Sequence, residues 1–293
     1  MFTAKDVKDL REKTGCGMMD CKKALTETNG DMEAAIDFLR EKGLAAAQKK
    51  AGRIAAEGIV ASYVAEDNKT GAIIEVNSET DFVAKNAEFK AFVGDLAMLV
   101  AKENPADVDA LMALKYPASD LTVEEMLREK ILTIGENMKI RRFARYEGTV
   151  VCYIHGEGRI GVMVNIDGAD FEAAKDAAMQ IAAINPLYLS KSVVPEADVE
   201  KEKHIIISQI KEDPKNANKP DNILEKMVGG KIEKFFKENC LLQQPFVKDD
   251  SVTVEAYLSG KGVTLKDFVR FEKGEGLEKK EENFADEVAN MVK

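Results

Sequence analysis

Tryptophan is absent from the 293 residues, and histidine and cysteine are scarce, with two and four copies. No CxxC pair occurs among the cysteines, which are Cys16, Cys21, Cys152 and Cys240. Zinc sites and disulfide frameworks usually show closely spaced cysteines. We therefore expect free thiols in a reducing compartment, and neither a metal site nor a disulfide scaffold.

Long apolar runs and an excess of positive charge are also missing. No window approaches the roughly 18 apolar residues that a membrane span requires, and the opening MFTAKDVKDLREK has no apolar signal core. We expect a cytoplasmic protein without membrane contacts. The net charge is −10, whereas binding to nucleic-acid phosphates needs a basic face. We therefore expect no direct contact with nucleic acid, although a local basic patch stays possible.

Signatures of catalysis are missing as well. The chain contains no HExxH motif, no GxxxxGK[ST] phosphate loop and no local Ser/His/Asp signature. Of the two histidines, His155 lies in the turn sequence HGEGR and His204 in a helix-prone segment. We predict that the protein is not an enzyme, has no catalytic residues and needs neither a cofactor nor a metal.

The first part of the chain, residues 1–55, is predicted to be a module of three short helices and a linker. Thr3 suits the start of the first helix, and Asp31 suits the start of the third. The pair Asn29-Gly30 favours the end of the second helix, and Gly43 favours the end of the third. So small a module usually binds a partner or packs on a neighbour, since it has little room for a catalytic site.

An internal repeat organises the rest of the chain. The stretch EGIVASYVAEDNKTGAIIEVN begins at Glu57, and EGTVVCYIHGEGRIGVMVNID begins at Glu147; the two align without a gap. Each is typical of a β-hairpin. An alanine-rich helical stretch follows each one, with an Asp-Phe pair at its start, Asp81-Phe82 in the first copy and Asp170-Phe171 in the second.

The repeat continues toward the ends of both copies. TVEEML resembles TVEAYL, and FARYEG resembles FVRFEKG, which alternates like a strand with one buried face. We therefore predict an α+β fold with a duplicated β-β-α…β core. Its N-subdomain takes residues 56–146 and its C-subdomain residues 147–274.

The second copy carries an insertion at residues 187–247, which we predict to be a helical hairpin. Two amphipathic stretches flank the polar connector PKNANKP. Such an arm buries its apolar stripe within the hairpin, against the body of the protein or against a second molecule. Residues 275–293 are predicted to form a C-terminal helical module, because Phe284, Val288 and Met291 share one helical face.

Phe82 has two interpretations. It lies seven positions before Phe89, in phase with the apolar stripe of the following helix, and Phe171 has the same phase in the second copy. Periodicity therefore favours a buried residue in the first turn of a core helix. The alternative is an aromatic side chain directed at something outside the protein.

Several long motifs are similar to those of one family. LREKTGCGMMDCKKALTETNGD, VNSETDFVAKN, IGENMKIRRFARYEG, HGEGRIGVMV, KPDNILEKMVGGKIEKFF and FVRFEKGEGLEK closely resemble motifs of bacterial translation elongation factor Ts, in the same order along nearly the whole chain. The resemblance implies a ubiquitin-associated-like N-terminal module, a duplicated core, a coiled-coil hairpin and a C-terminal helix. It also implies guanine-nucleotide exchange on GDP-bound elongation factor Tu during translation elongation.

In this family the loop that corresponds to Thr80, Asp81, Phe82 and Val83 displaces the partner's magnesium, and the Phe side chain enters the partner. By the same resemblance, Ile134, Gly135 and His155 lie on contacting surfaces, as do the N-terminal module and the C-terminal helix. A homodimer through the inserted hairpin is compatible with the resemblance. We accordingly expect Phe82 to be exposed and Phe171 to be buried. The alternative function is a binding or chaperone module without exchange activity that uses the three-helix domain.

Overall fold

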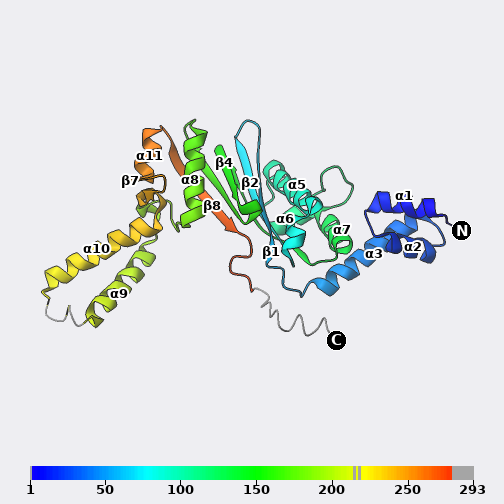
Figure 1. The fold of residues 1–293 in the computed structure, drawn as a ribbon, viewed down its shortest axis with the longest axis horizontal. Helices are drawn as coiled ribbons and strands as arrows, with labels where there is room; N and C mark the ends of the chain where they lie inside the picture. The colour runs from blue at the N-terminus through cyan, green and yellow to red at the C-terminus, as the bar shows by residue number, and fades with distance from the viewer. Residues whose placement is uncertain (1, 214–215, 217–218, 279–293) are drawn as a thin grey trace.

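The computed structural model describes residues 2–213, 216 and 219–278. The described chain is elongated, with a group of short helices at one end, a helical hairpin at the other and two sheets between them (Figure 1). Within these residues no helix is long and apolar enough to cross a membrane.

The N-terminal helices are α1 (Ala4–Thr14), α2 (Met18–Glu27) and α3 (Met32–Lys50). The side chain of Thr3 caps α1 and that of Asp31 caps α3, as their positions predicted. The expected end of the third helix at Gly43 is wrong, since α3 continues to Lys50. A glycine inside a helix costs only about 1 kcal/mol relative to alanine, so packing can override it.

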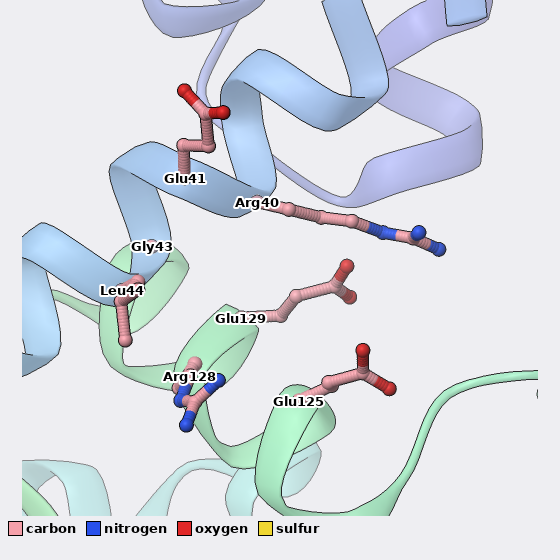
Figure 2. Close-up of a pocket in the computed structure, with 7 residues that line it drawn as sticks. All are labelled: Arg40, Glu41, Gly43, Leu44, Glu125, Arg128 and Glu129. Atoms are coloured by element: carbon pink, nitrogen blue, oxygen red, sulfur yellow. The ribbon is translucent and has the colours of Figure 1, made fainter.

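That packing is against α7 (Val123–Ile134). A side chain at Gly43 would begin 3.7 Å from the carbonyl oxygen of Arg128, and the ammonium of Lys50 donates to the carbonyl of Ile131. A pocket of about 220 Å³ opens beside this contact, where Figure 2 shows Arg40 of α3 and Glu129 of α7 extending to the same side. Burial raises the pKa of Glu129 despite the nearby Arg40.

The two copies of the repeat form two three-stranded antiparallel sheets. The first has the order β1 (Glu57–Val64), β2 (Thr70–Ser78) and β3 (Met138–Glu147), and the second has the order β4 (Thr149–His155), β5 (Ile160–Asp167) and β8 (Thr264–Glu272). Each contains a bulge at the same repeat position, after Glu75 and after Asn165. The predicted duplication is therefore confirmed down to an irregularity of the strands.

Helices cover one face of each sheet. The first sheet packs against α4 (Asp81–Lys85) and α5 (Ala87–Glu103), and α6 (Val108–Ala113) and α7 complete its core. The second sheet packs against α8 (Phe171–Ile184) and α11 (Val254–Gly260), beside the short strands β6 (Pro245–Phe246) and β7 (Asp249–Thr253). The helix–sheet layers explain why both sheets bury their alternating apolar residues.

The other faces of the two sheets pack on each other with approximate two-fold symmetry. Val60 and Ile73 of the first sheet meet Val150 and Met163, their repeat equivalents. A side chain at Gly71 would lie 2.5 Å from Val150 Cγ1. Its equivalent, Gly161, has the same relation to Val60 Cγ1, also at 2.5 Å. The two glycines therefore let the sheets approach closely.

Gly71→Ala and Gly161→Ala should each lower the free energy of unfolding by about 1–3 kcal/mol, because the added methyl overpacks the contact between the sheets. Urea denaturation measures this. Gly94→Ala is the matched control: Gly94 lies inside α5 with no atom within 4 Å of the added carbon, so this variant should gain stability from helix propensity. Equal effects at all three positions would contradict the packing account.

The insertion forms the predicted hairpin of α9 (Glu196–Glu212) and α10 (Asp221–Asn239) (Figure 1). Its small core contains Ile206, Ile210 and Ile232. Thus the hairpin buries part of its apolar stripe within itself, and the homodimer stays a prediction that sedimentation can test. Of the expected C-terminal helix, residues 279–293 lie outside the described part.

A buried carboxylate ties the first sheet to the segment after the second. Glu75 of β2 is fully buried and accepts hydrogen bonds from Arg141 Nη1 at 2.9 Å and Arg142 Nε at 2.6 Å. It also accepts from the backbone N–H of Gly274 at 2.8 Å and from Asn77 Nδ2 at 3.1 Å. Because Gly274 follows β8, this cluster crosslinks the two copies of the repeat.

Candidate functional site

Phe82 is the most exposed large apolar side chain of the described residues, with 80% of its surface accessible. The interpretation as a core residue is therefore wrong. Asn86 has extended backbone angles (φ −64°, ψ 130°) and caps α5, so the helix is interrupted between Phe82 and Phe89. Since the two phenylalanines lie in different helices, the apolar phase of α5 does not extend back to Phe82.

Phe171 is 40% exposed, so the expectation that it is buried is also wrong. It is the first residue of α8, directly after the capping Asp170, and α8 buries five of its alanines and Ile181 against the second sheet instead. The two phenylalanines nonetheless differ, because Phe82 has twice the exposed fraction of Phe171.

The short helix α4 holds Phe82 outward by burying its opposite side. Val83 and Ala84 are buried in the first core. Thr80 caps the helix by accepting from the N–H of Val83 at 3.4 Å. Asp81 pairs with Lys85 at 2.7 Å, and this hydrogen bond lowers the pKa of Asp81. The exposed aromatic ring is therefore carried by an anchored turn of helix.

The structure brings Ile134 and Gly135 close to this loop. Ile134 ends α7 and packs partly on the first core, and the exposed Gly135 ends the helix with φ +89°. The next residue, Glu136, accepts hydrogen bonds from the backbone N–H of Thr80 at 3.0 Å and from its hydroxyl at 2.6 Å. Two segments that are far apart in sequence therefore form one surface.

His155 lies at the end of β4, is exposed and shares a hydrogen bond of 3.0 Å between its Nδ1 and the hydroxyl of Tyr153. The turn that follows it faces the Phe82 loop. A shallow hollow of about 330 Å³ is lined on one side by Asp81 and Lys85 and on the other by Gly156 and Glu157. Asp81 and the turn after His155 therefore line one hollow, whereas Val83 is buried beneath the loop.

Glu136 and Glu79 were not among the predicted site residues, although both belong to the surroundings of the loop. Glu79 accepts from the backbone N–H of Asn137 at 2.6 Å. The sequence did carry a signal, because Glu136 directly follows Gly135 in IGENMKI and Glu79 directly precedes Thr80 in NSETDFV. Neither motif shows that the two segments are in contact.

The chemistry of the described residues suits protein contact. They contain no group of three His, Cys, Asp or Glu side chains placed to hold a metal ion. Burial raises the pKa of Cys152 to about 12, which makes this thiol a poor nucleophile at neutral pH. The exposed aromatic ring on its anchored turn is a candidate contact residue, because aromatic side chains are enriched at protein interfaces.

The family model described as Elongation factor TS matches residues 79–275, which include the whole loop, strand β3 and all of the second sheet, but not β1 and β2. The chain belongs to the elongation factor Ts family. Elongation factor Ts of Clostridium perfringens (strain 13 / Type A) is 55% identical over 305 residues, covering 99% of each chain. That of Clostridium novyi (strain NT) is 52% identical over 308 residues, covering 100% of this chain and 99% of the relative.

Elongation factor Ts of Clostridium kluyveri (strain NBRC 12016) is 50% identical over 307 residues, again with 100% of this chain and 99% of the relative covered. Membership of the elongation factor Ts family assigns the chain to protein biosynthesis. It also implies guanine-nucleotide exchange on elongation factor Tu, as the sequence motifs did.

Proposed function

We propose that the protein binds GDP-bound elongation factor Tu and promotes GDP release by inserting the loop of Thr80, Asp81, Phe82 and Val83, which displaces the partner's magnesium. The observation that carries the proposal is the 80% exposure of Phe82 on a turn of helix whose other side is buried. The ring needs no unfolding of this protein to enter a partner. Ile134, Gly135 and His155 supply surrounding contacts in the proposal.

The free energy for this step comes from burial of the ring. Transferring a phenylalanine side chain from water into a partner contributes about 1.5–3 kcal/mol. Magnesium requires near-ideal octahedral geometry, so a ring that fits only a distorted magnesium site weakens GDP binding. The coupling is reciprocal: GDP weakens binding of this protein by the same factor, and excess GTP then favours its release.

The proposal is tested by following the release of a fluorescent GDP analogue from elongation factor Tu. Substoichiometric amounts of this protein should accelerate release and turn over many copies of the partner. A pull-down with this protein as bait should recover elongation factor Tu, and added GDP should compete it off. Retention of the partner at saturating GDP, without acceleration of release, would support the alternative of a binding or chaperone module that uses α1–α3.

The role of magnesium gives a separate prediction. When Mg²⁺ is chelated, GDP release from the partner alone should already be fast, because the ion that bridges protein and phosphate is gone. The acceleration by this protein should therefore shrink, by a factor within the roughly 5- to 150-fold span of typical coupling. The measurement is the ratio of release rates with and without this protein, in excess Mg²⁺ and in chelator. An unchanged ratio would show that exchange proceeds without displacement of the metal.

A further inference from the structure

Two glutamates link the two chain segments at the base of the Phe82 loop, because each carboxylate accepts hydrogen bonds from the segment that carries the other glutamate. Glu136, which follows α7, accepts from the backbone N–H of Thr80 at 3.0 Å and from its hydroxyl at 2.6 Å. Glu79, which precedes Thr80, accepts from the backbone N–H of Asn137 at 2.6 Å. Each segment therefore receives a carboxylate from the other. We call this reciprocal pair of contacts, formed by Glu79, Thr80, Glu136 and Asn137, the glutamate brace.

The glutamate brace begins where the sheet ends. The last pair of residues in register between β2 and β3 is Ser78 and Met138. The brace residues lie just beyond this pair, where the two segments separate toward α4 and α7. Carboxylates that accept backbone N–H groups make stronger hydrogen bonds than neutral acceptors do. The brace thus holds together two segments that the backbone ladder no longer joins.

The second copy of the repeat closes the same strand pair without such a brace. By strand register, Gly168 and Val263 correspond to Ser78 and Met138, and Lys261 and Gly262 correspond to Glu136 and Asn137. There the two backbones touch directly, since a side chain at Gly168 would begin 2.5 Å from the carbonyl oxygen of Gly262.

The segment before the helix also differs between the copies. Ala169 alone separates Gly168 from Asp170. In the first copy, Glu79 and Thr80 separate Ser78 from Asp81. The fold therefore does not require the brace, and the copy that has it is the one that exposes its phenylalanine at 80%.

We propose that Glu136 and Glu79 are positioning residues that pre-organise Phe82 for insertion; the inference rests on the proposed function of Phe82. Thr80 connects the glutamate brace to α4. Its hydroxyl donates to Glu136 and also caps α4 by accepting from the N–H of Val83. Fixing Thr80 fixes the first turn of α4, and with it the direction of the ring relative to Gly135. Pre-organisation lowers the entropy lost when the loop enters the partner.

The test compares Glu136→Ala, Glu136→Gln and the control Glu147→Ala in the GDP-release assay. Glu147 lies at the other end of β3, and its exposed carboxylate pairs with Arg145. Glu136→Ala should lower the maximal release rate at saturating protein about tenfold, with little change in the half-saturating concentration, because other contacts supply the binding. Glu136→Gln should recover part of the rate, since its amide oxygen accepts one of the two bonds. Glu147→Ala should match the unmodified protein.

A double variant separates positioning from general destabilisation. In Phe82→Ala/Glu136→Ala no ring is left to position, so release should be no slower than in Phe82→Ala alone. A normal maximal rate in Glu136→Ala, with Phe82→Ala slow, would overturn the positioning role and leave the proposed function intact. The positioning role would also be overturned if Glu136→Ala lowered the melting temperature without changing the maximal release rate. Normal release in Phe82→Ala would overturn the proposed function, and the positioning role with it.

Discussion

Phe82→Ala should slow the release of GDP from elongation factor Tu by roughly 10- to 150-fold at saturating protein. The ring contributes about 1.5–3 kcal/mol when it is buried in the partner, and each 1.36 kcal/mol corresponds to a factor of ten in rate. In the free protein the ring is 80% exposed, so that free energy is available only in the complex. Stopped-flow fluorescence with labelled GDP measures the effect.

The free energy of unfolding should barely change in Phe82→Ala, by about 0.5 kcal/mol or less, because exposed side chains contribute little to stability. Two phenylalanines of the same chain serve as controls. Phe171→Ala alters the equivalent repeat position and should release GDP normally. Phe89→Ala removes a fully buried ring and should cost about 3–5 kcal/mol of stability. Slow exchange in Phe82→Ala together with an equally large loss of stability would point to a folding defect instead.

The sequence predicted the repeat well, because it depends on local patterns. Strand alternation and a gapless alignment from Glu57 and Glu147 were enough to predict two related sheets. Thr3 and Asp31 likewise acted as caps where they stand in the sequence. Gly43 shows the limit of such signals: its helix-ending tendency is overridden by contact with α7, more than 80 residues later in the chain.

The environment of Phe82 was also hard to predict, because it depends on backbone geometry and on contacts between distant segments. Its spacing from Phe89 fits one continuous helix, and only the backbone angles of Asn86 show that there are two. Periodicity could not predict the glutamate brace, because the segments that carry Glu79 and Glu136 come together only once β2 and β3 are in register. The family resemblance identified the loop, but not the contacts that hold it.

Glu75→Ala should lower the free energy of unfolding by about 3–5 kcal/mol, the largest loss of stability expected from a change outside the apolar core. Glu75 is fully buried and neutralises both Arg141 and Arg142, whose side chains are largely shielded from water. Removing the carboxylate leaves two guanidinium groups close together and the N–H of Gly274 without its acceptor. Urea denaturation measures the loss, and Glu147→Ala, which breaks an exposed pair, should change stability by less than about 1 kcal/mol.

The pH dependence of stability supplies an independent check on the charge of Glu75. Burial alone would raise the pKa of Glu75, but hydrogen bonds from Gly274, Arg141, Asn77 and Arg142 outweigh it and hold the pKa below the ordinary 4.5. A carboxyl whose pKa is lower in the folded state stabilises the fold fully above its unfolded pKa. That stabilisation is lost as the pH falls below 4.5 and through the folded pKa.

Glu75→Gln isolates this contribution, because it keeps the size of the side chain and removes its titration. The difference in unfolding free energy between the unmodified protein and Glu75→Gln should be constant from neutral pH down to about 4.5 and should narrow below it. A difference that stays constant down to about pH 3 would mean that Glu75 acts only through packing and not as an ion. The difference in melting temperature between the two proteins should narrow over the same pH range. The reason is that the carboxylate joins β2 to the segment after β8 in the folded state.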